Sequence, residues 1–508
     1  MKRTLALAAL LTLLTAVESA LSGELLNNEA LYLFAAWKWW RPEFLAHDWS
    51  FAVPWREHAL FNAAAGLLSL AFPLGVFKWV LRVLGWFAVY AGLVALLRRL
   101  AVPWWAIPVG VLCWQVGGEA FVGGEWVIGG AEAKVPAYAA LFASLAAFLD
   151  RRHVAGGLLL GLCFSLHPAV GAGALAGVGA ALLADRTPWR GLALAGTAGL
   201  CTAAPGLLAS AGVSRGTGAG DAAWEYIVRA RLPHHLDPFT FAPGGFLALA
   251  VFGGLLALLA CRWRPDRETR FVAAFVAGTA LLFAGGIAAR AMGAWPLLQV
   301  YPFRLLPLVL PMLVTPLLLA EAARHWRDPA ARRRALAAAA LGIGVLLARP
   351  DRWSLSGSEA ERRAVWGAPY SRADRQDQAA AAAWVADSAP PDAVVLATPT
   401  SKRAFWDYRR ALVVNWSALR YDRFAEWRRR IDALAGPVPP DGSLPLRGFD
   451  ARYDALGADS MAALGARYGA TLVVTHARYP FPLRFRAGAV SVYALPTAGS
   501  LSPPADRP

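Results

Sequence analysis

The residues that could do chemistry lie in five short polar segments of an otherwise apolar chain. The first segment follows three tryptophans and ends in His47 and Asp48. A carboxylate at a membrane surface is suited to act as a general base, or as a metal ligand, toward an amphiphilic substrate. Asp48 is also suited to cap the helix that follows it. A catalytic and a structural role therefore both fit this pattern.

Two further segments place ionisable groups at predicted helix boundaries. Glu125, Glu132 and Lys134 flank the start of a helix, where the lysine is expected to pair with one of the acids. His167 precedes Pro168 at the tip of a predicted helical hairpin. A histidine there is either a turn residue or, because ionisable groups are costly at membrane depth, a functional group.

The densest segment, 229–238, holds Arg231, His234, His235 and Asp237. Two chemistries fit these residues. His235 and Asp237 could share a metal ion, or the two histidines could donate hydrogen bonds to a phosphate whose charge Arg231 neutralises. The structural alternative is an interfacial loop ordered by its prolines.

The last segment contains Arg290, Tyr301 and Arg304. Arg304 is expected a few residues inside the next helix, so its guanidinium must snorkel outward or pair. A guanidinium at this boundary also suits a lipid-linked phosphate, which it binds through two parallel hydrogen bonds.

The elements that must position these residues are predicted to be membrane-spanning helices. The chain has 508 residues, of which 57% are hydrophobic and only 17% charged. Its apolar blocks approach the roughly 20 residues that a helix needs to cross a bilayer. The net charge of +16 sits mostly in short arginine clusters between these blocks, which argues against a nucleic-acid partner. We expect about eleven helices, near residues 1–21, 78–97, 102–116, 133–149, 154–167, 168–184, 191–208, 243–261, 270–289, 302–322 and 336–348.

The arginine clusters also predict the orientation of the helices. Segments 2–3, 98–99, 151–152, 186–190, 262–270 and 324–334 hold 17 Lys and Arg against 3 Asp and Glu. The longer segments 22–77, 117–132, 209–242 and 290–301 hold 7 against 11. Short positive loops stay in the cytoplasm. The sequence thus predicts a cytoplasmic N-terminus and polar segments on the opposite side.

Three regions complete the predicted organisation. Residues 1–349 form the membrane domain, in which 22–77 is a large first outer loop and 57–77 a helix lying on the outer interface. Residues 350–378 form a linker. Residues 379–508 form a small α/β domain outside the membrane, with strands expected at 393–398, 411–416, 471–476 and 490–495.

Well-known catalytic motifs are missing from the chain. There is no Walker loop, no GxSxG and no HExxH. The four cysteines have no zinc spacing. A cofactor therefore cannot be read from motifs. If a divalent metal ion takes part, Asp48, His235 and Asp237 are its predicted ligands.

The polar segments taken together resemble the GT-C superfamily of membrane glycosyltransferases, and most closely a family of bacterial multi-pass proteins within it. The similarity covers most of the chain. It rests on 47–49, on Glu132-Ala-Lys134, on His167-Pro168, on Arg231-Leu-Pro-His234-His235, on Tyr301-Pro-Phe-Arg304, and on tail segments such as 411–416 and 426–430.

This resemblance implies an active site on the periplasmic side of the bacterial inner membrane. It implies transfer of a sugar from a polyprenyl-phosphate donor in the bilayer to a glycan, lipid or protein acceptor. Asp48 matches the family's first-loop acid, although His47 stands where many members carry a second acid. We expect Asp48 as the base and Arg231, His234, His235 and Arg304 around the donor phosphate. Supporting roles are expected for His47, Glu125, Glu132, His167, Asp237, Arg290 and Tyr301.

Two other functions remain open at this point. A transporter or flippase for lipid-linked sugars predicts ionisable residues near mid-membrane and internal repeats. The expected spans are largely free of charge away from their ends. A non-catalytic scaffold in envelope assembly predicts that the C-terminal domain binds a partner and that Asp48 is dispensable for chemistry.

Overall fold

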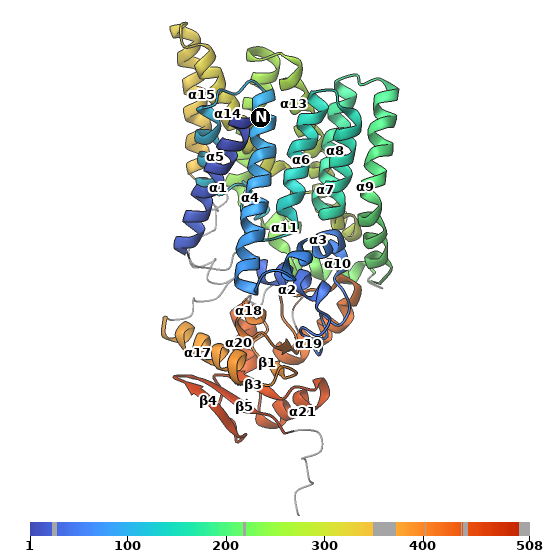
Figure 1. Cartoon of the computed structure of the whole chain (residues 1–508), viewed down its shortest axis with the longest axis vertical. Coiled ribbons are helices and arrows are strands. Elements are labelled where there is room, and N and C mark those ends of the chain that lie inside the picture. Colours follow the sequence, from blue (N-terminus) through green and yellow to red (C-terminus); the bar gives the residue numbers. More distant parts are fainter. Residues whose placement is uncertain are drawn as a thin grey trace, which may run out of the picture.

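The computed structural model of the protein consists of a tall helical bundle with a small α/β domain on one of its ends (Figure 1). It describes residues 1–22, 28–216, 220–348, 372–401, 403–437, 439 and 446–496. Most of the predicted linker and the end of the chain after 496 lie outside these residues. Residues 372–378, which were also expected in the linker, form the start of helix α17 (Arg372–Ser388).

The bundle contains a helix at every position where one was expected. Six of its helices are long and apolar enough to cross a membrane, so the described chain is that of a helical membrane protein. The other expected spans are shorter helices or, for α15, a helix outside these six, so a total of eleven spans stays a prediction. The six are α1 (Lys2–Ser22), α4 (Leu74–Arg99), α9 (Trp189–Gly216), α12 (Pro243–Leu258) with its continuation to Trp263, α13 (Arg267–Ala291) and α14 (Leu306–Arg324). The shorter bundle helices are α5 (Ala106–Val116), α6 (Lys134–Leu149), α7 (His153–Leu166), α8 (Pro168–Ala184) and α15 (Pro329–Leu347).

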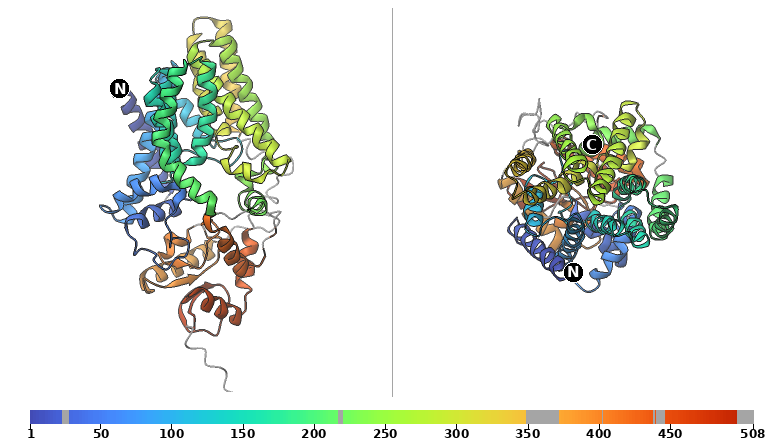
Figure 2. Two further views of the ribbon diagram at one scale, coloured as in Figure 1. Left: turned by 90° about the vertical axis from the view of Figure 1, so that its right-hand side faces the viewer. Right: turned by 90° about the horizontal axis from the view of Figure 1, so that it is seen from above.

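Close packing lets the short helix α7 run beside the long helix α9. Gly157 faces the carbonyl oxygen of Ala195, which would lie 2.2 Å from an added Cβ. Gly161 faces the carbonyl oxygen of Gly199 in the same way, at 2.0 Å. Small residues let helix backbones approach closely in membranes. Seen along the bundle, the helices stand side by side (Figure 2). Of the six long helices, α14 has the most buried apolar stretch, at 89%.

Ion pairs between helix termini mark one end of the bundle. Arg99 at the end of α4 lies 2.6 Å from Asp150, which follows α6. Arg267 at the start of α13 lies 2.7 Å from Asp185, which follows α8. Arginine clusters that were expected on one side of the membrane thus lie at the same end of the bundle. We call this the far end, because the C-terminal domain sits at the opposite end (Figure 1).

Short helices form a layer between the bundle and the C-terminal domain. α2 (Glu29–Trp40) and α3 (Ala59–Ser69) lie there together (Figure 1). With 11 residues α3 is too short to cross a bilayer, in line with the prediction that 57–77 does not span. The layer also contains η1 (Arg56–His58), α10 (Asp221–Tyr226), η2 (Ile227–Arg231), α11 (Pro233–Leu236), η3 (Pro238–Thr240) and η5 (Trp295–Val300).

The C-terminal domain is built on a mixed five-stranded sheet of order β2-β1-β3-β5-β4. β1 (Val394–Leu396) pairs in parallel with β2 (Ala411–Leu412) and β3 (Leu472–Thr475), whereas β5 (Val490–Ala494) pairs antiparallel with β3. These four strands fall where strands were expected. The fifth, β4 (Leu483–Ala487), was not expected because its sequence LRFRA is charged and mostly exposed, as suits an edge strand. The helices are α17, α18 (Ala404–Tyr408), η7 (Tyr421–Arg423), α19 (Phe424–Ala435), α20 (Leu446–Asp454) and α21 (Ala458–Tyr468).

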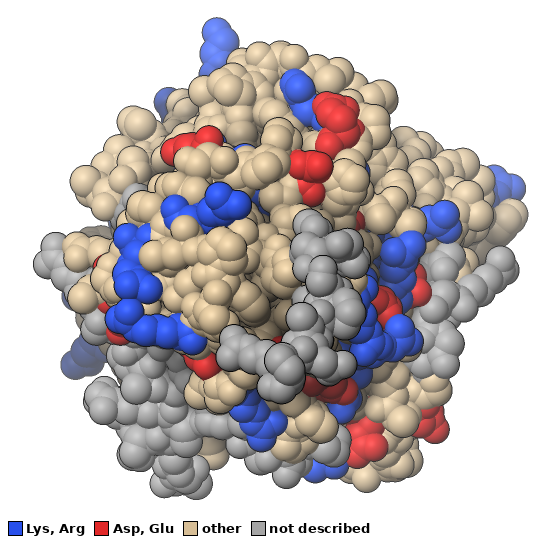
Figure 3. Space-filling model, turned by 90° about the horizontal axis from the view of Figure 1, so that it is seen from below, with Lys and Arg blue, Asp and Glu red and all other residues tan. Residues whose placement is uncertain are grey.

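The surface charge of this domain is mixed. On the face turned away from the bundle, Lys and Arg side chains stand in separate groups with Asp and Glu among them (Figure 3). The positive charge of the chain is therefore not gathered into one continuous basic surface on this face.

Candidate functional site

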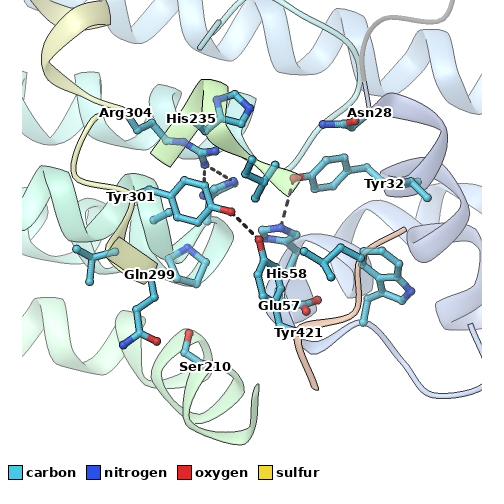
Figure 4. A pocket seen from close by; sticks show the side chains of 18 of the residues that line it. Asn28, Tyr32, Glu57, His58, Ser210, His235, Gln299, Tyr301, Arg304 and Tyr421 are labelled. Atoms are coloured by element: carbon cyan, nitrogen blue, oxygen red, sulfur yellow. Dashed lines mark hydrogen bonds between the residues drawn. The ribbon is translucent and has the colours of Figure 1, made fainter. Parts of the chain in front are cut away.

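A cavity of about 380 Å³ lies between the bundle and the C-terminal domain. Five of the residues singled out in the sequence line it: His167, Arg231, His235, Tyr301 and Arg304. Its walls come from α2 and η1, from the tip of α7 and α8, from η2 and η5, and from the segment 417–421 of the C-terminal domain. Figure 4 shows Arg304 and Tyr301 entering from one side and Tyr32, Glu57 and His58 from another.

Arg304 stands at the centre of a buried polar network. Its Nε lies 2.7 Å from an oxygen of Glu125, and its Nη1 lies 3.0 Å from Nε2 of His167. Its guanidinium also lies over the ring of Tyr301. The side chain is 11% exposed. Arg304 precedes α14, whose first residue is Leu306, so the expectation that it lies a few residues inside the helix is wrong. Of the two alternatives given for its guanidinium, the structure shows pairing.

Behind Arg304, Glu125 joins two cations. Lys134 lies 2.7 Å from Glu125 and 3.6 Å from Glu132, which confirms the expected pairing of the lysine with these acids. Burial raises the pKa of Glu125, but the charges of Arg304 and Lys134 outweigh this and hold the pKa below its usual range. Burial raises the pKa of Glu132 to about 7. Neither glutamate lines the cavity, so both support the site from behind.

The histidines at the cavity are neutral near pH 7. Burial and the charge of Arg304 hold the pKa of His167 well below its usual range, and burial lowers the pKa of His58 to about 4 and that of His235 to about 3. His235 Nδ1 lies 2.6 Å from the carbonyl oxygen of Gly123. Because a carbonyl oxygen only accepts, Nδ1 carries the proton and Nε2 is a bare acceptor. The prediction that His235 donates a hydrogen bond to phosphate is therefore corrected. Its neutral ring presents Nε2 to the cavity, and this nitrogen can only accept a hydrogen bond from a ligand.

Glu57 is the most unusual group at the cavity. Both its carboxylate oxygens are buried, and among the described residues neither makes a hydrogen bond of ordinary geometry, although the backbone of Tyr421 and the charge of Arg420 act on the group. Burial raises the pKa of Glu57 to about 7. A carboxyl group with this pKa accepts or delivers a proton readily near neutral pH. Its neighbour His58 contacts the hydroxyl of Tyr32 at 3.3 Å.

The C-terminal domain closes the cavity through two polar contacts. Arg231 Nε donates to the carbonyl oxygen of Trp416 at 2.9 Å, and its guanidinium lies over the Trp416 ring. The hydroxyls of Tyr301 and Tyr421 are 2.6 Å apart. Arg231 thus lines the cavity and also fastens the domain. Tyr301 adopts a left-handed conformation with φ 53°, which turns the chain between η5 and α14.

Asp48, the expected base, occupies a different position. It is fully buried and does not line the cavity. One carboxylate oxygen accepts from the hydroxyl and amide of Ser50 and the amide of Phe51, and the other accepts from the amide of Leu412 in β2 at 2.8 Å. Asp48 therefore ends a turn and fastens β2 to the first outer loop. These contacts are structural, but they are not the predicted helix cap, because the next helix, η1, begins at Arg56 with Trp55 at its N-cap.

The remaining predicted residues do not reach the cavity. His47 is exposed, and the ring of His234 lies tilted against that of His235, with 4.1 Å between the ring centroids. Asp237 pairs with Arg290 at 2.8 Å. No three His, Cys, Asp or Glu side chains meet as a metal site within the described residues. The predicted ligand set of Asp48, His235 and Asp237 is wrong, because each of the three is engaged elsewhere.

Sequence reasoning missed Tyr32, Glu57, His58 and Tyr421. Glu57 and His58 carried a usable signal, because two adjacent ionisable residues precede an apolar stretch much as His47 and Asp48 do. Tyr32 and Tyr421 carried none. They reach the cavity only through the packing of α2 and of the C-terminal domain.

Comparison with protein-family models and with curated proteins finds no match to this chain.

Proposed function

We propose that this protein is a membrane glycosyltransferase that transfers a sugar from a polyprenyl-phosphate donor to an acceptor. The observation that most supports this function is the content of the cavity. Two largely buried guanidinium groups, those of Arg231 and Arg304, line it together with the buried carboxyl group of Glu57. It lies where an apolar bundle meets a polar domain, which suits a donor whose chain stays in lipid and whose sugar stays in water.

In this proposal Arg304 and Arg231 bind the donor phosphate. A guanidinium matches phosphate geometry and keeps its charge even when buried. Glu125 holds Arg304 in place from behind at 2.7 Å, and Lys134 in turn lies 2.7 Å from Glu125. The charge that develops on the leaving phosphate is stabilised best by such preorganised groups.

Glu57 takes the proton in this proposal. The acceptor hydroxyl attacks the anomeric carbon, the bond between that carbon and the phosphate oxygen breaks, and the lipid phosphate leaves with the electron pair. The hydroxyl proton passes to the carboxylate of Glu57. His235 Nε2 accepts a hydrogen bond from a substrate hydroxyl. Asp48, which the resemblance implied as base, serves as an anchor instead.

We also propose the orientation that the arginine clusters predict. The far end faces the cytoplasm of a bacterial inner membrane, and the cavity and the C-terminal domain face the periplasm. The bound partners are then the bilayer, the lipid-linked donor and a periplasmic glycan, lipid or protein acceptor.

The donor class is tested by binding in lipid nanodiscs. A polyprenyl phosphate should bind at least about tenfold more tightly than the polyprenol that lacks the phosphate, because charged hydrogen bonds are worth about 1.5–3 kcal/mol each. The variant Arg304→Gln should lose most of this difference. Arg290→Gln is the matched control, since Arg290 pairs with Asp237 outside the cavity. Equal binding of both lipids to the natural protein would contradict the proposal.

The transfer step is tested by comparing Glu57→Gln with the natural protein. In a strain that depends on this protein, the glycolipid product should fall about a hundredfold or more, as expected for loss of a general base. The variant should still bind polyprenyl phosphate. A transporter would instead move the donor without cleaving it, so the intact donor would appear on the other side of the membrane.

A further inference from the structure

A second cavity lies at the far end of the bundle, remote from the proposed active site. It measures about 460 Å³ and runs along the start of α7 beside α9. Its lining has a basic part and an apolar part. Arg151, Arg152 and His153 stand at one end, and Val154, Ala155, Leu158 and Leu194 form the apolar remainder.

Hydrogen bonds fix the backbone at the two arginines, whose side chains are exposed. Arg151 N donates to the carbonyl of Phe148 and Arg152 N to that of Ala147, both at 2.9 Å. Arg151 adopts φ 57°, a conformation that a non-glycine residue rarely takes. This turn ends α6 and starts α7 within three residues, so the backbone of both arginines is held at the mouth of the cavity.

Neither arginine forms a direct ion pair among the described residues, although the charge of Arg151 is near enough to Asp185 to help lower the pKa of that carboxyl group. The nearby carboxylates are engaged elsewhere: Asp150 pairs with Arg99 at 2.6 Å and Asp185 with Arg267 at 2.7 Å. Among the described residues, neither Arg151 nor Arg152 has an acid within ion-pair distance. The amides that begin α7 also lack a side-chain cap, and uncapped helix N-termini favour anions. The mouth of the cavity therefore favours the binding of an anionic group.

The apolar part of the cavity opens to the outside of the bundle. Val154 is 46% exposed, Leu158 39% and Leu194 53%. In a membrane protein such side chains face lipid tails. A ligand that fills the whole cavity must have an anionic head and a hydrocarbon chain running along α7.

We propose that this cavity binds an anionic phospholipid, with its phosphate at Arg151 and Arg152 and an acyl chain against Leu158 and Leu194. Basic pockets between membrane helices at the cytoplasmic side bind such head groups. The ligand differs from the proposed donor in place and in kind, because this site lies at the opposite end of the bundle and holds no proton-transfer carboxylate.

The test is native mass spectrometry and nanodisc binding with phosphatidylglycerol and phosphatidylcholine of identical acyl chains. The natural protein should retain phosphatidylglycerol selectively. The double variant Arg151→Gln/Arg152→Gln should weaken this binding by roughly fivefold for each arginine removed. Arg333→Gln/Arg334→Gln removes the same charge from α15 outside the cavity and should leave binding unchanged.

Three outcomes would overturn the proposal. An equal loss in both double variants would mean that only overall charge attracts the lipid. Competition by glycerol phosphate as strong as that by the lipid would mean a free-phosphate site. Full phosphatidylglycerol binding by Ala155→Phe, which fills the apolar part and keeps both arginines, would exclude the acyl-chain groove. Binding of polyprenyl phosphate at the other cavity should be unaffected in all variants, so failure here leaves the proposed function standing.

Discussion

At the scale of single residues, hydrogen bonding and access to the cavity decide which acid is suited to proton transfer, because burial raises the pKa of both Asp48 and Glu57. Asp48 and Glu57 belong to the same outer loop and are separated by eight residues in the sequence. The carboxylate of Asp48 accepts well-formed hydrogen bonds at both oxygens, whereas among the described residues that of Glu57 makes none of ordinary geometry. A buried carboxyl group without well-formed hydrogen bonds favours its neutral form, which raises its pKa toward the range useful for acid–base work.

The pKa of about 7 for Glu57 predicts a pH dependence. Below pH 7 Glu57 is neutral and does not repel a bound phosphate. As pH rises through 7 it becomes charged, so affinity for a polyprenyl phosphodiester should fall while the rate of transfer rises. A phosphodiester is the right probe because it keeps one charge over this range. Titrating its binding to the natural protein and to Glu57→Gln checks this.

The variant Glu57→Gln should bind the phosphodiester with nearly the same affinity at pH 6 and pH 8. Glu132→Gln is the matched control, since Glu132 also has a pKa of about 7 but does not line the cavity. If the pH dependence survived in Glu57→Gln and vanished in Glu132→Gln, the titrating group would be Glu132, and the assignment to Glu57 would be contradicted.

At the scale of elements, the first outer loop and the C-terminal domain depend on each other. Arg420 is fully buried and donates to the carbonyl oxygens of Ser50 and Val53, and Arg423 donates to that of Trp49. Asp48 adds the contact to Leu412. Because the segment 417–421 lines the cavity, this attachment also shapes the proposed active site.

The variant Asp48→Asn should therefore loosen the domain rather than abolish proton transfer directly. Two N–H donors would face each other at Leu412, or the amide would turn and lose the bonds from Ser50, at a cost of about 1–3 kcal/mol. Hydrogen exchange should become faster at β2 and in segment 417–421. Unchanged exchange with complete loss of transfer would restore Asp48 as the base.

At the scale of the whole molecule, polar groups gather at both ends of the bundle but in different ways. At the far end, single arginines pair with single acids across helix termini, as Arg99 does with Asp150. At the opposite end, Glu125, Lys134, Arg304 and His167 form one connected buried network. The far end suits orientation in the membrane, and the opposite end suits chemistry.

The proposed orientation is tested by cysteine labelling in intact cells. In a cysteine-free background, a cysteine at Arg429, whose side chain is 57% exposed on the C-terminal domain, should react with a membrane-impermeant maleimide. A cysteine at the exposed position Arg333 should react only after lysis. The reverse pattern would place the cavity in the cytoplasm and refute a periplasmic active site.

The sequence by itself determined the class of the molecule. Apolar blocks of helical length predict bundle helices because backbone groups in lipid must be satisfied within the segment, and every expected helix is present. Short runs rich in β-forming residues located four of the five strands. The sequence also identified five residues that line the cavity. Charged and hydrogen-bonding side chains beside apolar blocks cost free energy to bury unless they have a partner or a ligand, so they are expected to have a role. These residues are Arg231, His235, Tyr301, Arg304 and His167.

Only the tertiary structure decided which of these residues share a cavity and which acid faces it. The contact of Asp48 with Leu412 joins residues 364 positions apart, and no local pattern encodes such a distance. The bare nitrogen of His235 depends on the carbonyl of Gly123, which comes from another loop. Hydrogen bonding and access to the cavity are properties of the assembled fold, and these properties separate the anchoring Asp48 from Glu57.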